Sequence, residues 1–174
     1  MDLNSRRFNC FNNVAVLDGG GLYATGGSDV FIRRLLLNGN RANLGGALCF
    51  SDSSTIQLNN GNIILNTAEN GGGIWASEIT GTIDTVSFRN NTAENLGGAL
   101  NLSNNSDLEA TDMVVNNNSA NRGGGISILN SVGDFVGGEI NNNYAWRGGG
   151  IFSFRSDLDF FSITLTQNNS EDCL

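Results

Sequence analysis

The sequence predicts an all-β protein with a single domain over residues 1–174, and a regular repeat is the main reason. Gly-Gly pairs begin at positions 19, 45, 71, 97, 123 and 148, so the step between them is 26 four times and 25 once. An Asn-x-Ala motif precedes each pair at nearly the same step. Short apolar runs, such as 30–32 and 63–65, lie between turn-forming Gly, Asn, Ser and Asp residues. Such runs favour strands, because a helical repeat needs ten or more consecutive helix-forming residues.

Two apolar columns share this period. The first lies three residues after each leading glycine and consists of Leu22, Leu48, Ile74, Leu100, Ile126 and Ile151. The second lies three residues before each repeated Asn and consists of Leu37, Ile63, Phe88, Val115 and Ile140, with Cys10 at the equivalent place in the first copy. Because a side chain that recurs once per repeat packs against its own copies, we expect both columns to face inward, Cys10 included.

Three short strands and three turns in each repeat unit fit one coil of a parallel β-helix. The sequence therefore predicts a right-handed parallel β-helix, a solenoid of about six to seven coils, with coils starting near residues 19, 45, 71, 97, 123 and 148 and a partial coil over 1–18. Equivalent residues of successive coils would lie about 4.8 Å apart. Leucine-rich repeats have a similar length, but the several Leu at fixed steps that they need do not occur here.

The repeated Asn predicts a ladder of side chains inside the solenoid. Stacked Asn amides can bond to the turn backbone and to the next Asn along the stack, which satisfies polar groups that would otherwise be buried alone. The expected ladder residues are Asn13, Asn40, Asn66, Asn91, Asn118, Asn143 and Asn169.

The composition excludes several function classes. The sequence contains no His and no Lys, which removes Ser-His and Cys-His nucleophile pairs, His-ligated metal sites and Schiff-base lysines. A net charge of −8 without a basic run argues against nucleic acid as a partner. We expect no membrane span, since no apolar stretch approaches the roughly 18 residues that a spanning helix needs, and we expect no cofactor. The start of the chain lacks the apolar core of a signal peptide, so secretion would require a removed leader or a longer parent chain.

Residues 88–100 read Phe-Arg-Asn-Asn-Thr-Ala-Glu-Asn-Leu-Gly-Gly-Ala-Leu. This segment resembles the paired FxxN and GGAI/L motifs of the chlamydial polymorphic outer membrane proteins, and Gly-Gly-Ala-Leu at 45–48 is another good copy. The resemblance extends over residues 11–170. It implies a parallel β-helix at the cell surface or outside the cell, since members of this family are typically secreted passengers and adhesins.

Acidic residues form the first candidate site. Asp29, Asp107, Asp134 and Asp157 recur where a turn enters a strand, and three of the four follow Ser. We expect Asp107, Asp134 and Asp157 on consecutive coils, about 5 Å apart. Turn chemistry is the favoured interpretation. A Ca²⁺ site with these three residues as ligands and a catalytic carboxylate pair are the alternatives.

A second candidate is the position directly after the first apolar column, which we expect to face outward. It is occupied by Tyr23, Cys49, Trp75, Asn101, Ser127 and Phe152. The three aromatic residues Tyr23, Trp75 and Phe152 are a candidate binding face for sugar rings or a protein partner. The alternatives are that they are ordinary isolated exposed aromatics, or that a side sheet or loop covers them. Cys49 would be exposed. We expect three free thiols, with a link from Cys173 to a neighbouring molecule as the alternative.

Together these features predict a non-enzymatic extracellular solenoid that acts as a structural rod, a filament subunit or a cell-surface scaffold. An adhesin passenger or a glycan-binding module is the alternative, and a carbohydrate-active enzyme is less favoured. The expected partners are copies of the same chain stacked end to end, or adjoining segments of a longer chain. A surface glycan or protein is a further candidate partner.

Overall fold

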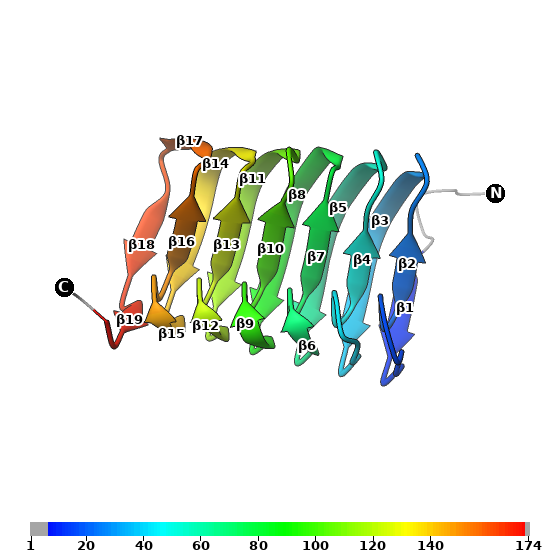
Figure 1. The fold of residues 1–174 in the computed structure, drawn as a ribbon, viewed down its shortest axis with the longest axis horizontal. Helices are drawn as coiled ribbons and strands as arrows, with labels where there is room; N and C mark the ends of the chain where they lie inside the picture. Colours follow the sequence, from blue (N-terminus) through cyan, green and yellow to red (C-terminus); the bar gives the residue numbers. More distant parts are fainter. Residues whose placement is uncertain (1–6, 173–174) are drawn as a thin grey trace.

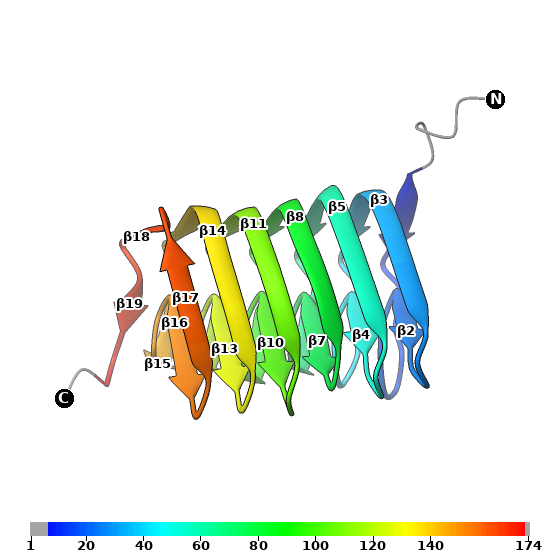
Figure 2. The same cartoon turned by 90° about the horizontal axis from the view of Figure 1, so that it is seen from above.

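A computed structural model describes residues 7–172, and every element in it is a β-strand. The chain winds into about six turns of about 26 residues, and successive turns add strands to three parallel sheets. Figures 1 and 2 show the strands side by side along the rod, with the first and last coils at opposite ends. The predicted all-β solenoid is confirmed. None of the described residues belongs to a helix that could cross a membrane.

Sheet 1 has eight strands and includes the longest strands of each coil. Its members are β1 (Phe8–Phe11), β3 (Asp29–Asn38), β5 (Thr55–Ile64), β8 (Thr80–Arg89), β11 (Asp107–Asn116), β14 (Val132–Asn141), β17 (Asp157–Phe161) and β18 (Thr164–Thr166).

Sheet 2 has five strands and follows the repeated Asn in each coil. Its members are β6 (Thr67–Asn70), β9 (Thr92–Leu96), β12 (Ser119–Arg122), β15 (Tyr144–Arg147) and β19 (Asn169–Ser170). Sheet 3 has six strands and follows the Gly-Gly pair. Its members are β2 (Leu22–Ala24), β4 (Leu48–Phe50), β7 (Ile74–Ser77), β10 (Leu100–Ser103), β13 (Ile126–Leu129) and β16 (Ile151–Phe154).

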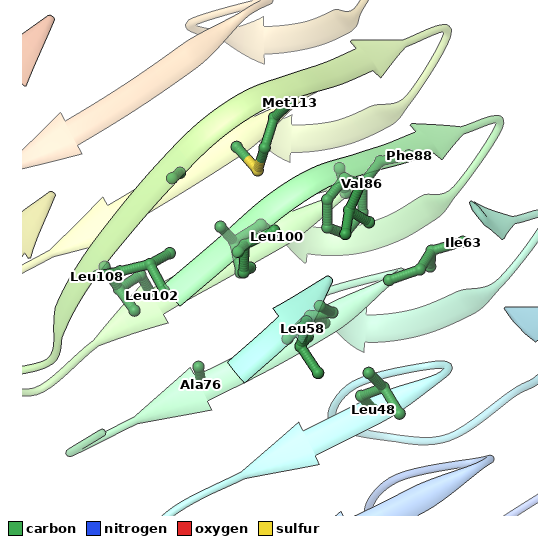
Figure 3. Packing of buried hydrophobic residues seen from close by; sticks show 14 of the residues in the cluster. Leu48, Leu58, Ile63, Ala76, Val86, Phe88, Leu100, Leu102, Leu108 and Met113 are labelled. Carbon is green, nitrogen blue, oxygen red and sulfur yellow. The ribbon is translucent and has the colours of Figure 1, made fainter. Parts of the chain in front are cut away.

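The core is built from residues that lie in register with their own copies. Leu100 pairs with Ile74 on one side and Ile126 on the other, and all three are buried. Figure 3 shows this packing around Phe88 and Leu100. Cys10 pairs with Leu37 and packs against the core, so its predicted inward orientation is confirmed. Each coil therefore buries its apolar side chains mainly against the coils next to it.

The Asn ladder forms at the corner between sheets 1 and 2. The Asn91 Oδ1 atom accepts hydrogen bonds from the backbone N–H of Asn66 at 3.0 Å and from its side-chain amide at 2.9 Å. The Asn91 amide donates to the carbonyl of Ile63 at 2.8 Å and to the Oδ1 atom of Asn118 at 3.0 Å. The same pattern repeats from Asn40 onward, so these buried amides are satisfied entirely by neighbouring coils.

The last predicted member of the ladder is wrong. Asn143 donates to the Oδ1 atom of Asn168 at 2.9 Å, whereas Asn169 lies in β19 opposite Tyr144. The reason is that the final coil is one residue shorter, so residue 143 is equivalent to residue 168. The second apolar column also identifies Asn168 as the ladder residue. Leu165 continues this column, because it pairs with Ile140, and it lies three residues before Asn168.

Each Gly-Gly pair makes the corner between sheets 2 and 3, and its two glycines have different tasks. Gly97 adopts a φ of 61°, which side chains with a Cβ atom rarely adopt. Gly98 lies so close to the next coil that an added Cβ atom would be 2.2 Å from the carbonyl oxygen of Gly124. The first glycine is therefore needed for the turn and the second for the close stacking of coils.

Replacement of Asn91 by Leu tests the ladder. The change leaves the Asn66 amide donors, the Ile63 carbonyl and part of the Asn118 side chain without partners in a buried place. We expect a loss of at least about 3 kcal/mol in the free energy of unfolding, measured by denaturant titration. The exposed residue Asn121 provides the matched control, because Asn121→Leu removes no ladder bond. Equal stability of the two variants would contradict the ladder.

Candidate functional site

The outward stripe on sheet 3 differs from the prediction. Tyr23 is 47% exposed, but Cys49 and Ser127 are 0% exposed and Asn101 is 2% exposed, while Trp75 and Phe152 are half-buried. Of the candidate binding face, Tyr23 is exposed, whereas Trp75 and Phe152 are half-buried and separated by buried residues. The expected exposure of Cys49 is wrong. The Asn101 Oδ1 and Ser127 Oγ atoms are also buried, so they offer nothing to a ligand arriving from solvent.

At two places a side chain just before the Gly-Gly corner approaches an outward position of sheet 3 in the next coil. The Arg122 guanidinium at the end of β12 lies 5.7 Å from the ring of Phe152, one coil further on. The equivalent residue in the first coil is Asp18. Burial, with a smaller contribution from the Asp18 charge, raises the pKa of the Cys49 thiol to about 12. Side chains of one coil thus lie close to outward positions of the next coil at Cys49 and Phe152.

The cysteines lie apart in the fold. Cys10 and Cys49 are both free, which agrees with the expected thiols at these two positions. Burial also raises the pKa of Cys10. Cys173 lies outside the described residues, so the expectation for its thiol stays a prediction.

The predicted acidic row does not form. Asp107 and Asp157 are separated by Val132, which pairs with both of them, so they lie two coils apart. Asp134 instead pairs with Glu109 on one side and Asp159 on the other. The reason is a step of 25 residues in this coil as well, which makes Val132 the copy of Asp107 and places Asp134 two residues further along the strand.

The structure thus creates a different acidic row, consisting of Glu109, Asp134 and Asp159 on the outward face of sheet 1. These exposed carboxylates line a surface depression of about 350 Å³ together with Val136 and Phe161. Within residues 7–172, no three His, Cys, Asp or Glu side chains are arranged so that they could hold a metal ion. Neither the predicted Ca²⁺ ligands nor the actual row provides a metal centre in this part of the chain.

The Ser residues that precede Asp have a structural role that the sequence only partly revealed. Ser106 Oγ donates to the carbonyl of Ser103 at 2.6 Å and accepts from the backbone N–H of Ile79 at 3.2 Å. Ser131 Oγ accepts from the backbone N–H of Ser106 at 3.3 Å. These bonds form a second ladder at the corner between sheets 3 and 1. The turn interpretation of the Ser-Asp pairs therefore holds for Ser, and the equal spacing of Ser106, Ser131 and Ser156 was the available signal.

An exposed aromatic pair also lies on sheet 2, at a place where the sequence predicts none. Tyr144 and Trp146 are 44% and 52% exposed, whereas Ala145 between them is fully buried. The Tyr144 hydroxyl bonds to the carboxylate of Glu171 in the adjacent coil, and this bond raises the pKa of Tyr144. The alternation around the repeated Ala was the signal that could have identified this pair.

Residues 85–103 match the Chlamydia polymorphic membrane protein repeat. The matched segment contains the end of β8, the ladder residue Asn91, β9, the Gly97–Gly98 corner and β10, which together make most of one coil. The protein is a β-solenoid in which one coil matches a polymorphic membrane protein repeat. Comparisons with curated proteins and with solved structures find no significant match. Polymorphic membrane protein-like repeats fit a surface-exposed structural or adhesin-like role and an outer-membrane or surface location.

Thiol labelling tests the covered outward stripe. In a Cys10→Ala/Cys173→Ala background, Cys49 is the sole thiol. We expect no reaction of the native protein with Ellman's reagent at pH 8, because the thiol is buried and stays protonated, and rapid reaction of the same protein in guanidinium chloride. Rapid labelling without denaturant would mean that Cys49 faces solvent.

Neutralisation of the acidic row tests its register. Like charges directly opposite one another on adjacent strands repel. We therefore expect Glu109→Gln/Asp134→Asn/Asp159→Asn to raise the melting temperature by about 2 °C at low salt, and less at high salt. Asp107→Asn is the control, since its neighbours in register are Thr80 and Val132. A triple variant no more stable than this control would argue against the row.

Proposed function

We propose that the protein is a non-enzymatic, surface-displayed solenoid that serves as a stiff structural rod or scaffold. The observation that carries this proposal is the unbroken inter-coil register. Sheet 1 continues from β1 to β17, and the Asn ladder runs from Asn13 to Asn168. Because each coil is bonded to the next along three sheets and two ladders, the molecule resists bending and offers long lateral surfaces.

The carboxylates support the non-enzymatic part of the proposal. A retaining pair of carboxylic acids needs two different environments, so that one group stays protonated while the other is ionised. Glu109, Asp134 and Asp159 all lie exposed on the same face of sheet 1, in equivalent positions of successive coils. Equivalent environments do not separate an acid from a nucleophile.

The end coils are suited to continuation by further coils, provided either by a second copy or by adjoining segments of a longer chain. Phe160 and Leu165 occupy inward positions in register with buried residues, yet they are 46% and 50% exposed. Residues 7–45 contain four Arg and two Asp, whereas residues 130–172 contain six carboxylates and two Arg. Opposite charges at the two ends favour head-to-tail contact, which produces open filaments rather than closed dimers.

Charge exchange at the ends tests this contact. We expect the purified chain to form rods that lengthen with concentration at about 50 mM salt and shorten at about 500 mM, as seen by light scattering and negative-stain microscopy. Arg33→Glu/Arg34→Glu should prevent lengthening, and the added changes Asp157→Arg/Asp159→Arg should restore it. Arg89→Glu, in a middle coil, is the control. Particles that stay monomeric at all concentrations in low salt would contradict self-stacking.

A further inference from the structure

The outward face of sheet 2 changes from polar to aromatic side chains at one strand, β15. Because the coils repeat, β15 can be compared with the equivalent strands of the earlier coils. The two outward positions are polar in earlier strands and aromatic in β15: Thr67 and Glu69 in β6, Ser119 and Asn121 in β12, but Tyr144 and Trp146 in β15. No element of the repeat requires this change, since the inward residue is Ala in every strand from β6 to β15.

The two rings are accessible from the side of the rod. Side chains two residues apart on a strand point the same way and lie about 7 Å apart. Figure 1 shows β19 beside β15, so the neighbouring coil is already in place and still leaves Tyr144 and Trp146 about half exposed. The exposure of this pair therefore does not depend on the open end faces.

Polar groups surround the rings in fixed positions. The Tyr144 hydroxyl is bonded to the Glu171 carboxylate, and the Arg147 Nε atom donates to the Asp172 Oδ2 atom at 2.6 Å. Asn121, one coil before Trp146, is exposed. The Trp146 indole N–H has no acceptor within residues 7–172, so it is free to donate to a ligand.

We propose that Tyr144 and Trp146 form a lateral binding platform for a neutral glycan chain. The aromatic faces would pack on the C–H faces of sugar rings, while the Trp146 N–H, the Asn121 amide and the Glu171 carboxylate bond to hydroxyl groups. Aromatic faces also stack on nucleic acid bases, but phosphates would meet the Glu171 carboxylate on a chain of net charge −8, while Arg147 is already paired with Asp172. The same charges disfavour acidic sugars. This inference goes beyond the structural rod and does not depend on end-to-end stacking.

A glycan array with neutral, amino-sugar and acidic chains tests the platform at physiological salt. We expect binding to neutral glycans, and at least tenfold weaker binding by Trp146→Ala and by Tyr144→Ala. Tyr23→Ala is the matched control, because it removes an exposed Tyr from sheet 3, and it should bind like the unchanged protein. Melting temperatures of all variants, monitored by circular dichroism, establish that each one is folded.

Fluorescence gives a second and direct measurement. The chain has two Trp, so Trp75→Phe leaves Trp146 as the sole reporter. We expect titration with the best neutral oligosaccharide of the array to shift or quench its emission in a saturable way, and an acidic oligosaccharide to leave it unchanged. The proposal is wrong if no neutral glycan binds, if acidic glycans or nucleic acids bind more tightly, or if folded Trp146→Ala binds as well as the Tyr23→Ala control.

Discussion

Hydrogen bonding between each coil and its neighbours is the constraint on which the rest of this protein depends. A single coil cannot satisfy its own corner groups, because Asn91 takes its partners from Ile63, Asn66 and Asn118, all in other coils. This dependence forces equivalent residues into register. Because the coils are in register, every side chain packs against the equivalent side chains of adjacent coils, and the apolar columns form a core. A residue that does not fit its column therefore disturbs the packing of both neighbouring coils.

The same constraint explains where a function can arise on a solenoid. The inward positions and the corners are occupied by structural requirements, which leaves only the outward rows free to vary. Glu109, Asp134 and Asp159 make one of these rows acidic, and Tyr144 with Trp146 makes one strand of another row aromatic. A departure from the repeat on an outward row therefore has no structural explanation and is the natural place to look for a ligand.

Small differences in coil length account for the errors in the sequence-based assignment. The Gly-Gly pairs keep a constant step up to residue 123, but the last step is one residue shorter. The following coil, from Asn143 to Asn168, also has 25 residues, and the assumed step of 26 placed the expected ladder at Asn169. Alignment on Ser-Asp and Gly-Asp pairs placed Asp134 beside Asp107, although Val132 occupies that place. In strands, where side chains alternate, such a shift changes either the partner or the face of a residue.

The sequence by itself determined the all-β class, the period, the inward apolar columns and the glycine corners, because these features repeat and a repeat needs no knowledge of distant contacts. Only the tertiary structure decided which outward-facing residues are exposed and which are buried. Cys49, at an outward position, is fully buried and lies near Asp18 of the preceding coil. Left-handed backbone at Arg34 and Thr85, with φ of 56° and 54°, bends sheet 1 although neither residue type favours it. Stacking imposes both outcomes, since a residue in one coil must follow the path set by the coils on either side.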